Sequence, residues 1–130
     1  MPDKAFPQTH DGMIDALEFV EAAMAGDDAE LIDRAMLVAG EVLANAVEHG
    51  GSDPARRIRV SVERVDRQLD LIVEEPRRVV DVETVETSDL PEDLLATSGR
   101  GLFLIRTLAD DVEPAGESRI RYVFRPRSDS

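Results

Sequence analysis

Two stretches in the first half of the chain repeat apolar residues at helical spacing, and glycine follows each one. The first runs over about residues 12–25 and ends at Gly26. Asp27 and Glu30 then resemble a capping box with the aspartate as cap. The apolar stripe of the second stretch consists of Leu31, Ile32, Ala35, Met36, Ala39, Val42, Leu43, Ala46 and Val47. The glycine pair at 50–51 ends it, so the pattern predicts two successive helices.

The period then changes from helical to two, which predicts β-strands. Apolar and polar residues alternate over residues 58–63, 69–74 and 119–125. A turn near Asp66 makes the first two of these strands a hairpin, and Pro76 closes the second. Such alternation is typical of an antiparallel sheet with helices on one face, and the arginines at 119, 121 and 125 would then line the other face.

Residues 77–97 show no sustained period, apart from a short helical turn suggested around residues 92–95 by Ser88 and Pro91. A long irregular stretch inside a compact domain is usually a functional lid or disordered, and we expect a lid at about 77–98. It leads into Ser98-Gly99-Arg100-Gly101. A further helix follows, with its apolar positions at Leu102, Ile105, Leu108 and Ala109.

The order helix, helix, hairpin, lid, helix, strand predicts a two-layer α/β (α+β) sandwich, with the helices on one face of a mostly antiparallel sheet. A chain of 130 residues fits one domain spanning residues 1–130. The final residues, from about 125 or 126 to 130, are expected to be a frayed tail.

Charge and composition narrow the possible partners. The net charge of −13 argues against binding nucleic acid or an anionic membrane surface, and it suits a protein partner with a basic patch. Without cysteine there can be no disulfide, thiolate metal site or cysteine nucleophile, which fits a reducing cytoplasm. No apolar run is long enough to span a bilayer, and the first residues do not resemble a signal peptide. We therefore expect a cytoplasmic protein.

The second predicted helix carries a polar stripe of Glu41, Asn45 and His49, each four residues from the next. This spacing places all three on one helical face. The amide oxygen of Asn45 suits Mg²⁺, and Glu41 could act as a general base, typically a ~10²–10⁴-fold effect. The alternative to these chemical roles is that Glu41 and Asn45 simply line a solvated edge of the helix. For His49 we favour a structural role, since an imidazole at a helix end interacts favourably with the helix dipole.

Gly99 and Gly101 stand just before the last predicted helix. Amides at a helix N-terminus attract anions, and glycine allows a phosphate to approach the main chain closely. Taken alone, this spacing fits a tight turn into a helix better than a phosphate site. The two features support the same interpretation, because the polar stripe would bind the metal ion and the glycines would bind the phosphate.

Together these motifs resemble the GHKL (histidine-kinase-like) ATPase superfamily, and within it the anti-sigma factors that are serine-protein kinases. The family helix motif E-L-x-x-N-A-x-x-H-G is matched by Glu41, Val42, Asn45, Ala46, His49 and Gly50. Its last motif, S-G-R-G-L-x-L-I-R-x-L-x-D-x-V after a D-L-L segment, is matched by residues 93–95 and 98–112. The resemblance covers roughly residues 12–124 and implies a Bergerat-type ATPase fold.

The resemblance implies a kinase that binds Mg·ATP, phosphorylates a STAS-type anti-sigma antagonist and sequesters a sigma factor, often as a homodimer. Glu41 would be the catalytic base and Asn45 the Mg²⁺ ligand. The nucleotide-binding residues would be Asn45, Glu75, Arg77, Ser98, Gly99, Arg100, Gly101 and Leu102. No direct nucleic-acid or membrane partner is expected.

One family motif is altered. D-x-G-x-G normally follows the second hairpin strand, where its Asp binds the adenine amino group. Here Glu75 takes the Asp position and Arg77 the first glycine position, or Glu74 is the acid if the register slips by one. A lost charged hydrogen bond costs ~1.5–3 kcal/mol, and an arginine forced to positive φ adds ~1–2 kcal/mol. We therefore expect weakened nucleotide binding; the alternative is a nucleotide-independent, pseudokinase-like binding module.

Two further charged clusters have no assigned chemistry. Arg56, Arg57 and Arg59 are expected to be solvated. Asp110 and Asp111 follow the last helix, where carboxylates are mildly unfavourable, so they would mark either a partner-facing surface or a solvated helix end.

Overall fold

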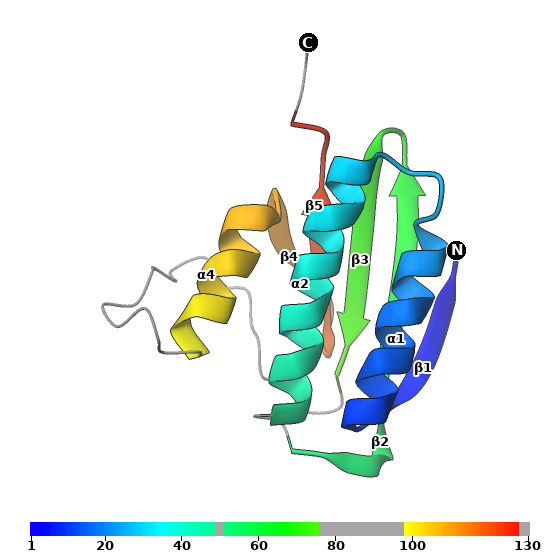
Figure 1. Cartoon of the computed structure of the whole chain (residues 1–130), viewed down its shortest axis with the longest axis vertical. Helices are drawn as coiled ribbons and strands as arrows, with labels where there is room; N and C mark the ends of the chain where they lie inside the picture. Colours follow the sequence, from blue (N-terminus) through cyan, green and yellow to red (C-terminus); the bar gives the residue numbers. More distant parts are fainter. Residues whose placement is uncertain (49–50, 76–97, 128–130) are drawn as a thin grey trace.

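The computed structural model describes residues 1–48, 51–75 and 98–127, and within them it forms the predicted two-layer α+β sandwich (Figure 1). One layer is a five-stranded antiparallel sheet in the order β1-β2-β3-β5-β4. The strands are β1 (Asp3–Gln8), β2 (Asp53–Val65), β3 (Gln68–Glu74), β4 (Asp111–Gly116) and β5 (Arg119–Phe124). The helices are α1 (His10–Ala23), α2 (Ala29–Glu48) and α4 (Ser98–Leu108). They lie side by side on one face of the sheet.

Side-chain caps fix where the first two helices begin. The Thr9 hydroxyl accepts a hydrogen bond from the Gly12 amide at 3.0 Å, which caps α1. Asp28, not Asp27, caps α2, because its Oδ1 accepts from the amides of Glu30 and Leu31 at 2.9 and 3.3 Å. The expected cap was therefore wrong by one residue.

The β2–β3 hairpin is the one the alternation predicted. Val65 pairs with Gln68, and Asp66 between them has φ +54°, a conformation that aspartate tolerates better than most residues. The edge strands β1 and β4 were not predicted. Each carries a proline, Pro7 or Pro114, and edge strands tolerate proline because one side of their backbone is unpaired.

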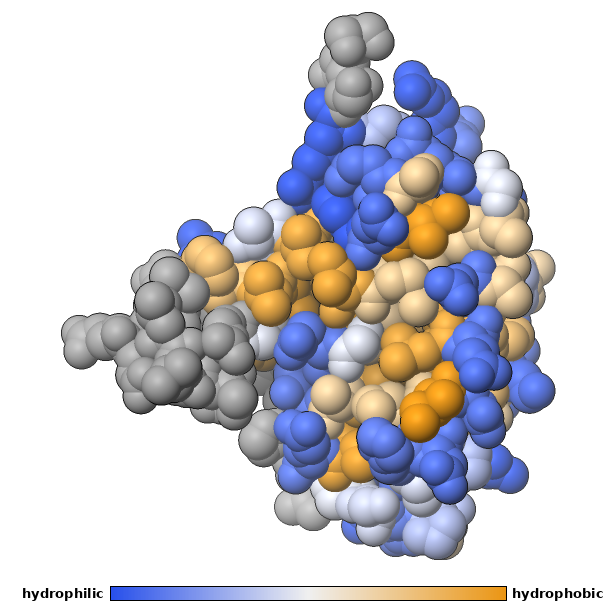
Figure 2. Space-filling model, in the orientation of Figure 1, coloured by the Kyte–Doolittle hydropathy of each residue, from blue (hydrophilic) through white to orange (hydrophobic). Residues whose placement is uncertain are grey.

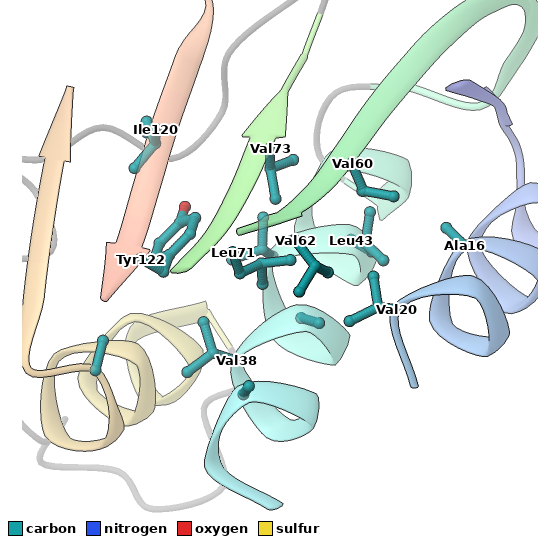
Figure 3. Packing of buried hydrophobic residues seen from close by; sticks show 14 of the residues in the cluster. Ala16, Val20, Val38, Leu43, Val60, Val62, Leu71, Val73, Ile120 and Tyr122 are labelled. Carbon is teal, nitrogen blue, oxygen red and sulfur yellow. The ribbon is translucent and has the colours of Figure 1, made fainter. Parts of the chain in front are cut away.

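The core lies between the helices and the sheet, as Figure 3 shows. Ala16 and Val20 of α1 and Val38 and Leu43 of α2 point toward the strands. The strand residues that meet them are Val60, Val62, Leu71, Val73, Ile120 and Tyr122. Each fully buried aliphatic side chain of this kind contributes ~1.5–3 kcal/mol. The alternation predicted these strand positions, and the helical spacing predicted Val20 and Leu43 but not Ala16 or Val38.

Ion pairs cover the other face of the sheet. Arg121 contacts the fully buried Asp70 at 3.0 Å and Glu63 and Glu113 at 3.8 and 4.0 Å. Arg119 and Arg125 pair in the same way with Glu74 and Asp111. The prediction that these arginines line the uncovered face is confirmed, but they are paired with neighbouring strands.

The Arg56–Arg59 cluster is also ion-paired in part. Arg56 lies 3.6 Å from Asp53, and Arg59 lies 2.9 Å from Asp3 on the neighbouring strand. Both arginines remain more than a third exposed, so these contacts add little to stability. The cluster is thus open to solvent as expected, but Arg56 and Arg59 are ion-paired.

Gly12 is the point of closest approach between α1 and β1. A Cβ atom added there would lie 1.9 Å from the Pro7 carbonyl oxygen, which is a clash with backbone. Only glycine therefore allows the first turn of α1 to sit against the first strand. No helix in the described residues is both long enough and apolar enough to cross a membrane.

Candidate functional site

Glu41 and Asn45 lie one turn apart in the second half of α2, on the side of that helix that faces α4. Asn45 is 8% exposed, and no described residue forms a hydrogen bond with its side chain. Glu41 is half-buried and forms no ion pair within the described part of the chain. The amide atoms of Asn45 keep some access to solvent, so no burial penalty applies to them and a ligand can reach them. His49 lies outside the described residues.

The first turn of α4 packs directly on this pair. A Cβ atom built on Gly101 would lie 2.6 Å from Glu41 Oε2 and 3.8 Å from Asn45 Nδ2. Any other residue at 101 would have to displace the Glu41 carboxylate. The helix motif and the glycine motif, distant in sequence, are therefore neighbours in the fold.

The glycines lie inside the helix rather than before it. We expected Gly99 and Gly101 to precede the last helix, but α4 begins at Ser98, so its first turn contains both. The role of Gly101 is thus a close approach to α2 and not a left-handed turn. The amide groups of this turn have no carbonyl partner within the helix, and they give α4 a positive end beside Glu41 and Asn45.

The remaining predicted nucleotide residues differ in what the structure describes. Leu102 is partly buried and packs against the core, so it anchors the first turn of α4. The side chains of Ser98 and Arg100 lie outside the described part of the chain, as does Arg77 altogether.

The two acidic residues after β3 point to opposite sides of the sheet. Glu74 lies 3.7 Å from Arg119 and 3.9 Å from Arg59 on the ion-paired face. Glu75 is 4% exposed, and its amide donates to the Ser118 carbonyl at 3.1 Å. Because side chains alternate along a strand, Glu75 follows Val73 toward the helical layer. Glu75 is therefore the carboxylate placed on the side of Glu41 and Asn45.

Arg34 links the first half of α2 to the C-terminal end of α4, at the opposite end of the contact between these helices from Glu41 and Asn45. This residue was not predicted from the sequence. Its side chain is 5% exposed, and the guanidinium contacts Glu30 Oε2 at 2.6 Å and Asp110 Oδ2 at 3.0 Å. It also donates to the carbonyl oxygens of Leu108 and Arg125. The available signal was a lone basic residue inside the apolar stripe of α2, next to Ala35.

Asp110 is part of this buried network rather than a partner-facing or solvated helix end. Burial alone would raise its pKa, but the hydrogen bond from the Arg125 amide and the nearby Arg34 charge lower the pKa below the ordinary value of 3.8. Asp111 lies 2.8 Å from Arg125, and Arg127 donates to the carbonyls of Thr107 and Leu108. The expected frayed tail is thus held in place as far as Arg127.

Gln8 ties the unpredicted strand β1 to the end of α2. Its side chain is 1% exposed, and Nε2 donates to the carbonyl oxygens of Ala46, at 3.3 Å, and Gly51. This fixes the backbone immediately after Asn45. The sequence offered no signal for Gln8 because β1 itself was not predicted.

The family model of the histidine kinase-like ATPase domain matches residues 6–121, which includes Glu41, Asn45 and Gly101. The chain belongs to the histidine kinase-like ATPase family. No curated protein matches the chain significantly. Family membership indicates an ATP-binding, kinase-like domain whose nucleotide carries a metal ion.

The described residues of this histidine kinase-like domain fit Mg·ATP in their chemistry. They contain no group of three or more His, Cys, Asp or Glu side chains placed to hold a metal. Mg²⁺ usually needs only one or two protein oxygens and takes its other ligands from phosphates and water. Asn45 offers such an oxygen, and the helix end at Gly101 offers amides to a phosphate.

Proposed function

We propose that this protein is an ATP-dependent serine-protein kinase of the anti-sigma type, acting in a cytoplasmic partner-switching system. It would phosphorylate a serine on a STAS-type antagonist, and it would sequester a sigma factor when that antagonist does not compete. The observation that carries the proposal is the packing of Gly101 against Glu41 and Asn45. A Cβ atom at Gly101 would lie 2.6 Å from Glu41 Oε2 and 3.8 Å from Asn45 Nδ2.

In the proposed reaction the serine oxygen attacks the γ-phosphorus of ATP, the bond to the β,γ-bridging oxygen breaks, and ADP leaves. Asn45 would hold Mg²⁺ through its amide oxygen, and the first turn of α4 would hold phosphate oxygens. Glu41 would accept the serine proton. Phosphoryl transfer depends mainly on positioning and on stabilising charge, which is what a rigid contact between two helices supplies.

Two features support the anti-sigma assignment within the family. The motifs at residues 41–50 and 98–112 match the anti-sigma kinases at both ends of the site. The net charge of −13 also suits a domain whose ligands, apart from ATP, are proteins.

The proposal is tested by incubating the protein with Mg·[γ-³²P]ATP and the STAS-domain proteins of the same genome. We expect label on a serine of one of them, and we expect Asn45→Ala to abolish transfer while its unfolding curve stays cooperative. Glu48→Ala, an exposed change on the same helix, is the matched control and should retain transfer. Transfer by Asn45→Ala at the wild-type rate would exclude the assigned role.

A second candidate is a nucleotide-independent binding module. The observation that favours it is the segment Glu75-Pro76-Arg77, which stands in place of the aspartate and glycine that recognise adenine. Against it, an idle site has no physical need for Gly101 to pack on a nearly buried Asn45. Titration with Mg·ATP separates the two candidates.

A further inference from the structure

The outer face of α2 carries no charge over most of its length. Leu37, Gly40, Ala44 and Val47 remain at least partly exposed, and Leu37 is 58% exposed. Helical spacing groups them on the side of α2 that faces away from the sheet. A surface helix is normally polar on this side, so an apolar outer face indicates that another molecule covers it. Figure 2 shows apolar surface here among strongly hydrophilic neighbours.

Carboxylates flank this outer face. Between residues 10 and 48 the chain has ten Asp or Glu residues and one Lys or Arg, a net charge of −9. The single cation is Arg34, which is buried and paired. Asp33, one turn before Leu37 on α2, and Glu21 on α1 are exposed and form no ion pair with a described residue. A partner for this surface must therefore bring positive charge around an apolar ridge.

We propose that the outer face of α2 is the docking site for an amphipathic helix of a partner protein, with an apolar ridge and flanking Lys or Arg residues. A straight partner helix could lie along the 20 residues of α2. In helix-in-groove recognition an amphipathic helix likewise binds through its apolar ridge. A Cβ at Gly40 would meet no atom within 4 Å, so a partner backbone has room to approach there. Leu37 is one turn from Glu41, which places the partner beside the proposed catalytic site.

This inference adds the chemistry of the protein partner to the proposed function. It rests on the proposed function in one respect, namely that a protein substrate binds near Glu41. The probe is a synthetic 18-residue helical peptide with a Leu/Ala ridge flanked by Lys, measured by fluorescence anisotropy. A second peptide has Glu in place of every Lys. We expect saturable binding of the Lys peptide and at least about tenfold weaker binding of the Glu peptide.

Leu37→Lys and Ala44→Lys place a positive charge on the outer face and should each weaken binding of the Lys peptide about tenfold. The matched control is Ala22→Lys, which adds the same charge at an exposed position of α1, away from this face, and should change binding less than twofold. Thermal unfolding confirms that each variant is folded. Should Leu37→Lys unfold, Ala44→Lys carries the test.

An equal loss of binding in Ala22→Lys would show that bulk charge alone attracts the peptide, and it would overturn the proposal. No saturable binding to the wild-type protein would overturn it too. A nucleotide titration on the same samples separates the two claims. Peptide binding without Mg·ATP binding rejects the kinase and keeps the docking site, whereas Mg·ATP binding without peptide binding rejects the docking site alone.

Discussion

Gly101 and Gly12 show how a single missing side chain can serve function at one position and stability at another. A Cβ at Gly12 would strike the Pro7 carbonyl at 1.9 Å, and backbone cannot move aside cheaply. A Cβ at Gly101 would strike Glu41 Oε2 at 2.6 Å, and that atom is the end of a flexible side chain. The fold can therefore tolerate a side chain at 101, but the carboxylate cannot stay where it is.

Gly101→Ala is accordingly expected to impair chemistry far more than folding. Displacing a catalytic group by about 1 Å can cost about a hundredfold in rate, so we expect phosphoryl transfer to fall by at least about tenfold. Moving the Glu41 side chain costs stability, but alanine stabilises a helix relative to glycine by up to about 1 kcal/mol. Because these two effects oppose each other, the free energy of unfolding should change by less than about 1 kcal/mol. Transfer is measured with labelled ATP and stability by urea denaturation.

Thr107→Ala, at the exposed far end of α4, serves as the control for Gly101→Ala and should keep the wild-type rate. A Gly101→Ala protein with unchanged transfer would show that the position of Glu41 is unimportant. A Gly101→Ala protein that fails to fold would show that the contact is structural.

At the residue scale the sequence predicted the stripe and assigned Gly101 to the same site, but it did not predict that Gly101 packs directly on Glu41. Glu41 and Asn45 were found because their spacing is local and helical. Their contact with Gly101 depends on the packing of α2 against α4, which no local pattern encodes. The choice of Glu75 over Glu74 likewise needed the strand register, because a shift by one residue reverses the face of every side chain.

Among the elements, α2 and α4 are fixed to each other at two places. Gly101 packs on Glu41 at one end of α4, and Arg34 binds the Leu108 carbonyl and Asp110 at the other. Removing one partner of a buried charge pair is costly, since the other is left without compensation. The Arg34 end thus helps to hold α4 at the distance the site requires.

The Arg34–Asp110 pair predicts a specific dependence of stability on pH. The pKa of Asp110 is lower in the folded protein than its ordinary value of 3.8, so its contribution is complete above that value and disappears as pH falls below it. Asp110→Asn should cost ~1.5–3 kcal/mol at pH 7. The gap between wild type and variant should close between about pH 4 and pH 2.

Urea denaturation at several pH values measures this gap. Asp15→Asn is the control, because it removes an exposed carboxylate of α1 that pairs with no described residue. Its difference from wild type should be small at every pH. A gap for Asp110→Asn that stays constant down to pH 2 would contradict the ion-pair explanation.

The elements themselves were predicted wherever one face is buried and the period is therefore regular. The three helices and the central strands β2, β3 and β5 follow from that rule. The edge strands β1 and β4 do not, since each contains proline and has a mixed pattern. The cap of α2 was misplaced because Asp27 and Asp28 are adjacent, and only geometry shows that Asp27 pairs with Arg64 instead.

For the whole molecule, charge is unevenly divided between the two layers. On the uncovered face of the sheet, arginines and carboxylates of neighbouring strands pair with one another. The segment that forms α1 and α2 carries nine of the thirteen net negative charges. Such an uneven field steers a basic partner toward one side of a protein and raises its association rate. The helical layer is therefore the side to which a basic protein partner is expected to come.

The central claim is that this fold still binds Mg·ATP between α2 and α4. Isothermal titration of the wild-type protein with ATP, with and without Mg²⁺, tests it directly. We predict saturable binding that requires Mg²⁺ and is lost in Asn45→Ala, with an affinity about ten- to a hundredfold below that of a site with an intact adenine motif. No heat of binding at millimolar Mg·ATP would contradict the account and leave the nucleotide-independent binding module.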